Sequence, residues 1–99
     1  MKVLITGSSG MLGSSIKKSA LAAGHEVLSP THGALDLEDE KGTLEYLDHE
    51  QPQVIYHCAA KVGGIAANIA NPLEYLIRNL RIDTSLLNAS TKTEIPNLF

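Results

Sequence analysis

The sequence has little of what defines several common classes of protein. Among its 99 residues there is a single cysteine, Cys58, so no disulfide can form within the chain and no cysteine zinc site is possible. Lysine and arginine number 8 against 11 aspartate and glutamate residues, and this formal charge of −3 lacks the basic excess of a nucleic-acid-binding module. We therefore expect no nucleic-acid partner, and a reducing, cytoplasmic location.

Long apolar runs are also missing. No apolar stretch approaches the roughly 18 residues that cross a bilayer, and the run at residues 3–5 is too short for a signal peptide. We therefore expect no membrane association. The apolar fraction of 43% and the charged fraction of 19% are, in contrast, typical of a folded domain rather than a disordered chain.

Short β-prone runs alternate with longer helical patterns along the chain. The expected strands are residues 3–5, 25–29 and 53–58 with the start of another at 97–99, and the expected helices are 11–23, 38–50 and 71–90. Such alternation is typical of a parallel sheet with helices on its faces. The buried face of the last helix is expected to consist of Leu73, Leu76, Ile77, Leu80, Thr84 and Leu87.

This pattern supplies only part of a complete dinucleotide-binding domain, which has about six strands. We expect an α/β chain that forms the N-terminal part of a Rossmann-type doubly wound parallel sheet, truncated after three to four strands and three helices. Residues 1–99 are then one partial NAD(P)-binding domain of a larger enzyme subunit.

A glycine-rich segment joins the first expected strand to the first expected helix. Gly7, Gly10 and Gly13 are three residues apart, which is typical of a loop that holds a pyrophosphate. The first glycine permits a sharp turn, the second lets phosphate approach the backbone, and the third lets the helix pack closely. A plain strand–helix turn is the alternative, although it does not need three regularly spaced glycines. The predicted cofactor contacts here are Gly7, Ser8, Ser9, Gly10, Met11, Leu12 and Gly13.

Four motifs together resemble the extended short-chain dehydrogenase/reductases, a family of nucleotide-sugar epimerases and dehydratases. They are residues 5–13, Asp36-Leu37, residues 57–60 and Asn79-Leu80. The resemblance implies an adenine pocket at Asp36 and Leu37, and further cofactor contacts from Ala59, Ala60, Lys61 and Asn79. Each has a simpler interpretation: Asp36 could cap a short helix, Lys61 could be a solvated charge, and Asn79 could be a surface amide.

Residues 59–80 are more specifically similar to the members of this family that act on GDP-linked keto sugars. The similarity lies in residues 59–65, followed by Asn68, Pro72, Glu74 and Asn79. It implies oxidoreductase and epimerase activity on a GDP-sugar, a loop at Val62, Gly63 and Gly64 beside the nicotinamide, and a homodimer built partly by the last helix. The alternatives are a related epimerase or dehydratase with tightly bound NAD, and a non-catalytic nucleotide-binding module in which residues 62–64 are a flexible connector.

The family's catalytic Tyr-x-x-x-Lys pair is missing from these 99 residues. Tyr46 precedes Glu50 by four residues, Tyr56 precedes Ala60, and Tyr75 precedes Asn79. Without the tyrosine and lysine there is no proton donor tuned near neutral pH. We therefore assign no catalytic residue and no metal site, and we expect this chain by itself to be inactive.

The end of the second expected strand favours NADP over NAD. NAD-specific sites place a carboxylate about 20 residues beyond the glycines, where it accepts from the ribose 2′-hydroxyl. Residues 29–33 read Ser-Pro-Thr-His-Gly, with no carboxylate to repel a 2′-phosphate. Ser29, Thr31 and His32 could donate hydrogen bonds to that phosphate, or they could form only a polar turn. We predict NADP as the cofactor, with His32 among its contacts.

Overall fold

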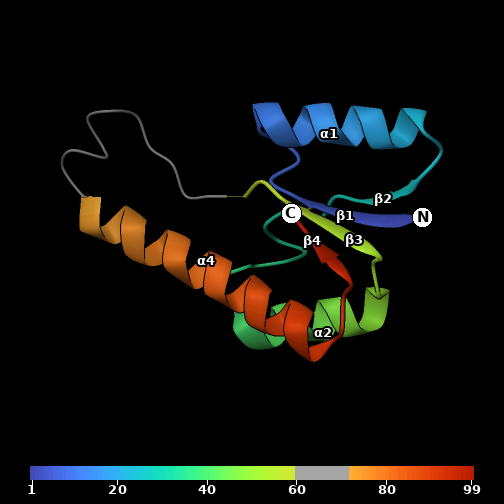
Figure 1. Ribbon diagram of the computed structural model, residues 1–99. Coiled ribbons are helices and arrows are strands. Elements are labelled where there is room, and N and C mark those ends of the chain that lie inside the picture. The colour runs from blue at the N-terminus through green and yellow to red at the C-terminus, as the bar shows by residue number, and fades with distance from the viewer. Residues whose placement is uncertain (60–71) are drawn as a thin grey trace.

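The computed structural model describes residues 1–59 and 72–99, which form a parallel sheet between two layers of helix (Figure 1). The strands are β1 (Lys2–Thr6), β2 (Glu26–Leu28), β3 (Val54–His57) and β4 (Asn97–Leu98), and the helices are α1 (Met11–Ala22), α2 (Glu40–Glu50) and α4 (Pro72–Lys92). Neighbouring strands pair in parallel in the order β2-β1-β3-β4. The predicted α/β class and doubly wound parallel sheet are confirmed.

The order of the strands creates a crevice at one edge of the sheet. The chain passes from β1 to β2 on one side of β1, and then returns to form β3 on the other side. Helix α1 covers one face of the sheet, whereas α2 and α4 cover the other (Figure 1). Connections that leave neighbouring strands toward opposite faces open a crevice outside the carboxyl ends of those strands. Ligands of this class of sheet bind there.

Strand β1 is buried on both faces, as its continuous apolar run predicts. Val3 and Ile5 pack with Val54, and the partly buried Ile16 of α1 covers them. Leu4 points to the opposite face and joins the larger core cluster beneath α2 and α4. Successive side chains of a strand point to opposite faces, so three consecutive apolar residues require cover on both sides.

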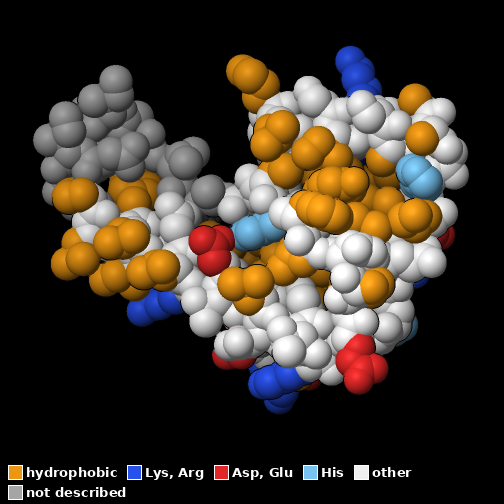
Figure 2. Space-filling model, viewed as in Figure 1, with side chains coloured by type: hydrophobic (Ala, Val, Ile, Leu, Met, Phe, Trp, Pro, Cys, Tyr) orange, Lys and Arg blue, Asp and Glu red, His pale blue; other side chains and the backbone are white. Residues whose placement is uncertain are grey.

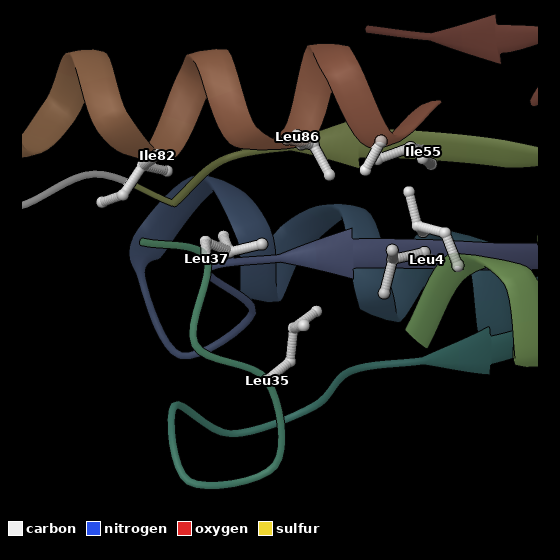
Figure 3. Packing of buried hydrophobic residues seen from close by; sticks show 8 residues of the cluster. Leu4, Leu35, Leu37, Ile55, Ile82 and Leu86 are labelled. Atoms are coloured by element: carbon white, nitrogen blue, oxygen red, sulfur yellow. The ribbon is translucent and has the colours of Figure 1, made fainter. Parts of the chain in front are cut away.

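Helix α4 packs through a different face from the one expected. Its buried residues are Ile82, Ser85, Leu86, Ala89 and Ser90. Figure 3 shows Ile82 and Leu86 in the cluster that includes Leu4 and Ile55 of the sheet. The six residues expected to be buried are exposed, among them Leu73 at 67% and Leu80 at 53%.

The expectation fails for two reasons: part of α4 extends beyond the sheet, and the part that packs on the sheet is turned so that Ile82 and Leu86 are buried while Leu87 is exposed. Only the C-terminal half of α4 lies against the sheet, and its N-terminal half extends beyond it (Figure 1). Apolar spacing marks a face that some partner can cover, but it does not say whether that partner is the same domain. The stripe that contains Leu73, Leu76 and Leu80 is therefore left open in this chain.

Helix α2 begins two residues later than expected. Asp39 is its N-cap, and the Asp39 side chain accepts a hydrogen bond from the Gly42 N–H at 3.2 Å. Asp36, the expected alternative cap, instead accepts from the Glu38 N–H at 3.0 Å within the preceding turn. The Asp36 carboxylate is thus held by a local turn and caps no helix.

In residues 1–59 and 72–99, no helix combines the length and the apolar character needed to cross a membrane.

Candidate functional site

A cavity of about 570 Å³ opens where β1, β2 and β3 end. This volume is within the range of sites that bind small molecules and cofactors. The lining comes from the turn after β1, the segment after β2 and the segment after β3, with one residue from α4. The described residues that line it are Thr6, Gly7, Ser8, Ser9, Gly10, Ser29, Pro30, Thr31, His32, Leu35, Asp36, Leu37, Glu38, Cys58, Ala59 and Ile82.

Two of the three loop glycines are required by the protein's own backbone. Gly7 has φ +69°, and a Cβ at this position would lie 2.7 Å from the Ala59 nitrogen. A Cβ at Gly13 would lie 2.7 Å from the carbonyl carbon of Gly7, because α1 starts directly above the turn. Neither position accepts a side chain without moving backbone, so both glycines have a structural role.

Gly10 differs from the other two glycines. A Cβ built on Gly10 would touch only the Gly7 carbonyl oxygen, at an ordinary 3.4 Å, and the φ of Gly10 is −77°. Neither space nor backbone conformation within this chain therefore requires glycine here. Gly10 lines the cavity, so the absence of a side chain keeps the backbone open on the cavity side.

The N-terminus of α1 adds hydrogen-bond donors to the same wall. Gly10 is the N-cap, no side chain caps the helix, and the first turn contains no acidic residue. The backbone N–H groups of a first helical turn have no acceptor within the helix, and they carry the positive end of the helix dipole. Such a terminus attracts anions, and phosphate groups in particular.

The segment after β2 forms the opposite side of the cavity. Leu35 and Leu37 are buried and belong to the core cluster, so they present an apolar wall. Glu38 pairs with Arg78 of α4, with 3.3 Å between the Arg78 Nε and a Glu38 oxygen. Among the described lining residues there is no lysine or arginine. An anion in this part of the cavity would be held by backbone N–H groups, hydroxyls and His32.

The ends of β1 and β3 are joined through the Thr6 side chain. The Cys58 and Ala59 N–H groups donate to Thr6 Oγ1 at 3.1 and 3.2 Å. His57 Nδ1 lies 2.7 Å from the same oxygen, and His57 Nε2 lies 2.7 Å from Asp83 Oδ1 on α4. Three elements that border the cavity are therefore linked by one series of hydrogen bonds.

The predicted site residues fall into three groups. Gly7, Ser8, Ser9, Gly10, His32, Asp36, Leu37 and Ala59 line the cavity together. Met11, Leu12 and Gly13 begin α1 beside the cavity, and Asn79 lies on α4; none of these four is among the lining residues. Ala60, Lys61, Val62, Gly63 and Gly64 lie outside the described residues.

Sequence reasoning missed several lining residues. They are Thr6, Pro30, Leu35, Glu38, Cys58 and Ile82. Thr6, Pro30 and Cys58 lie within two residues of a strand's carboxyl end, and in a parallel sheet those ends meet at one edge. That rule could have identified them. Ile82 had no such signal, because it depends on which face of α4 turns inward.

Comparison with known proteins identifies the family of the chain. Residues 3–99 match the model of the NAD dependent epimerase/dehydratase family, and the chain belongs to that family. It is 39% identical over 98 residues to GDP-L-colitose synthase of Yersinia pseudotuberculosis, covering 99% of this chain and 32% of that protein. It is 36% identical over 97 residues to GDP-L-fucose synthase of Azorhizobium caulinodans, covering 98% of this chain and 31% of that protein.

Solved structures share the same architecture. The structure titled DdhaC matches with a TM-score of 0.92 at 30% identity, over 98% of this chain and 28% of that one. The UDP-glucose 4-epimerase of Thermus thermophilus, in complex with NAD, matches with a TM-score of 0.84 at 26% identity, over 99% and 36% of the two chains. The chain spans about a third of the length of the curated relatives it matches.

Proposed function

We propose that the cavity binds a nicotinamide dinucleotide, with its pyrophosphate at the turn between β1 and α1. The observation that carries this proposal is Gly10, the loop glycine that the chain's own packing does not require. The uncapped N-terminus of α1 supplies N–H donors beside it. Leu35 and Leu37 offer an apolar surface for the adenine, and the Asp36 carboxylate can accept from the adenine amino group.

Substitution of Gly10 tests this proposal directly. Gly10→Val places a branched side chain where the phosphate would approach, and Gly10→Ala places one methyl group there. We expect NADPH affinity, measured by isothermal titration calorimetry, to fall by about tenfold or more for valine and by less for alanine. Ser15→Ala is the control, because Ser15 is exposed on α1 and is not among the described residues that line the cavity. Unchanged affinity in Gly10→Val would refute the proposed phosphate position.

We infer further that NADP is preferred over NAD. Ser29, Thr31 and His32 line the cavity just after β2, where a carboxylate would repel a 2′-phosphate. Some solved structures that share this fold carry NADP, and another carries NAD, so the fold alone does not decide between the two cofactors. Protonated His32 would pair with a 2′-phosphate, which gives a pH dependence.

Titration with both cofactors at about pH 6 and about pH 8 tests the preference. We expect NADPH to bind more tightly than NADH, and its affinity to fall with rising pH. His32→Gln should remove the pH dependence, and His49→Gln is the matched control on an exposed helix position. Equal or tighter NADH binding at both pH values would overturn the preference.

We propose that the protein takes part in the conversion of a GDP-linked keto sugar, as an epimerase and NADP-dependent reductase of the GDP-L-fucose synthase type. The sequence relatives named GDP-L-fucose synthase and GDP-L-colitose synthase support this substrate class. The role of this chain is the cofactor part, with Ala60, Lys61 and Asn79 as further contacts and residues 62–64 beside the nicotinamide.

The corresponding test is turnover of GDP-4-keto-6-deoxy-mannose with NADPH. We expect none from the 99-residue chain, because its sequence contains no Tyr-x-x-x-Lys pair to move the proton. Turnover by this chain would show that the catalytic group is among these residues. The alternative, a related epimerase with bound NAD, is tested by measuring turnover of a UDP-sugar with NAD. Turnover in that assay would favour the alternative.

We also propose that α4 contacts a second copy of the protein. Figure 2 shows apolar side chains gathered on the part of α4 that extends past the sheet. Leu73, Leu76, Ile77 and Leu80 are 40–67% exposed there. Leu76→Glu should reduce the mass measured by light scattering from dimer to monomer. Ser19→Glu adds the same charge on the exposed surface of α1, on the other face of the sheet (Figure 1), and should leave the dimer intact. A monomeric parent chain would contradict the proposal.

A further inference from the structure

The positions of His57 and its neighbours determine which imidazole nitrogen carries the hydrogen. Within residues 1–59 and 72–99, Thr6 Oγ1 has three partners, and two of them are the backbone N–H groups of Cys58 and Ala59, which can only donate. The third partner is His57 Nδ1 at 2.7 Å. Thr6 is 3% exposed, and of these three partners only His57 Nδ1 can accept its hydroxyl hydrogen. Nδ1 is therefore the unprotonated nitrogen.

The other side of the ring leads independently to the same conclusion. His57 Nε2 lies 2.7 Å from Asp83 Oδ1, and a carboxylate can only accept a hydrogen bond. Nε2 therefore carries the hydrogen and donates a hydrogen bond to Asp83. A neutral imidazole has one N–H, and both neighbours place it on Nε2. A hydrogen on Nδ1 would instead leave the Thr6 oxygen facing three N–H groups, with no acceptor for its own hydrogen among these described partners.

This arrangement fixes the relative positions of three walls of the cavity. Thr6 and His57 are register partners on adjacent strands, and Asp83 lies on α4 next to Ile82. Thr6, Ala59 and Ile82 all line the cavity, whereas His57 does not. The imidazole ring, whose side chain is 17% exposed, is the element between the β1 end and the α4 wall.

We propose that His57 is a positioning residue for the cofactor cavity. As the Nε2–H tautomer, His57 accepts a hydrogen bond from the Thr6 hydroxyl at Nδ1. This orients the lone pairs of the Thr6 oxygen toward the Cys58 and Ala59 N–H groups. Through Asp83 it anchors this arrangement to α4. The effect on cofactor affinity rests on the proposed dinucleotide function, whereas the tautomer and the Ala59 hydrogen bond do not.

The ligand-free test is nuclear magnetic resonance of the chain with ¹⁵N-labelled histidine at neutral pH. We expect the His57 Nδ1 resonance to have the shift of an unprotonated nitrogen and the Nε2 resonance that of a protonated one. Hydrogen exchange of the Ala59 amide should be about tenfold faster in Thr6→Val, which loses the hydroxyl, than in Thr6→Ser, which keeps it. An Nδ1–H tautomer, an imidazolium, or equal Ala59 exchange in the two variants would overturn the proposal.

The ligand-dependent test uses paired variants and NADPH affinity. Thr6→Val and Asp83→Ala should each raise the NADPH Kd about fivefold to tenfold, and the conservative Thr6→Ser and Asp83→Asn should stay within about twofold. Asp83 is half exposed, so its variants keep the fold even if Thr6→Val does not. Equal losses in the conservative and disruptive variants would overturn the positioning role.

The two hypotheses fail in distinguishable ways. If the parent chain shows no NADPH binding, the proposed function fails, and the tautomer with the Ala59 exchange still decides the role of His57. If NADPH binds and responds to Gly10→Val but not to Asp83→Ala, the proposed function stands and the positioning role is wrong.

Discussion

The backbone of Gly7 occupies the space in which a side chain of residue 13 would begin. A Cβ on Gly13 would lie 2.7 Å from the Gly7 carbonyl carbon and 3.0 Å from Ser8 Cα. Both atoms belong to the backbone of the turn that leaves β1, so neither can yield without displacing α1. The glycine loop therefore contains positions required for packing as well as a position open to a ligand.

The first prediction separates these two kinds of glycine by their effect on stability. Gly13→Ala should lower the free energy of unfolding by about 1–3 kcal/mol, because the new methyl group overlaps backbone. Gly10→Ala should change it by no more than about 0.5 kcal/mol, because its Cβ meets only an ordinary contact. Urea unfolding of both variants measures the difference. Equal destabilisation by the two variants would contradict the conclusion that Gly13, but not Gly10, is packed against the backbone of the turn.

The second prediction compares two leucines of α4. Leu86 is fully buried and Leu76 is 55% exposed. Leu86→Ala should lower the free energy of unfolding by about 2–5 kcal/mol, because it removes core atoms and leaves a cavity. Leu76→Ala should cost no more than about 0.5 kcal/mol in the monomer. The reverse order in urea unfolding would mean that α4 buries the face indicated by its apolar spacing.

The third prediction concerns alkaline pH. Burial raises the pKa of the Tyr46 hydroxyl above its ordinary value of 10.0, and the negative charge of Glu50 raises it further. The unfolded chain therefore loses this proton at a lower pH than the folded chain. The stabilisation is complete below about pH 10 and is lost as pH rises through the folded-state pKa.

Urea unfolding at about pH 9 and about pH 11 measures this loss, and Tyr46→Phe should reduce it. An identical loss of stability in Tyr46→Phe would assign the alkaline sensitivity to another group.

The fourth prediction is that the isolated chain has low stability. Strand β4 contains only two residues, and it forms the edge of the sheet beside β3. The outer side of an edge strand presents backbone donors and acceptors that can pair with another chain. We expect melting at or below about 60 °C with association on heating, measured by circular dichroism and light scattering. A cooperative monomeric melt well above that temperature would contradict this expectation.

Much of the fold could be predicted because it depends on local patterns. The apolar run at Val3, Leu4 and Ile5 requires cover on both faces, and that requirement places β1 inside the sheet. The inward face of α4 could not be predicted in this way. The sheet lies under only one half of the helix (Figure 1), which leaves Leu80 exposed, and within that half the helix buries Leu86 and exposes Leu87.

The candidate site likewise contains residues that local sequence could place and residues that only the tertiary structure could place. The glycine spacing and the segments after the strands are contiguous in sequence, so Gly10 and His32 could be placed near the cavity in advance. The link from Thr6 through His57 to Asp83 could not. Thr6 and His57 are 51 residues apart, and His57 and Asp83 are 26 apart. The register of β1 against β3 brings Thr6 to His57, and the packing of α4 on the sheet brings Asp83 to His57.

The amino end of β1 lies at the opposite edge of the sheet from the cavity. The Lys2 ammonium nitrogen lies 3.0 Å from a carboxylate oxygen of Glu50 there. The backbone N–H of Lys2 donates a hydrogen bond to the Gln53 side chain. Met1 is 59% exposed. The six residue steps from Met1 to Gly7 span about 20 Å, at roughly 3.3 Å per residue. A chain tethered to a sensor surface through Met1 would therefore present its cavity to the flowing solution, and small nucleotides could be compared on the same immobilised molecule.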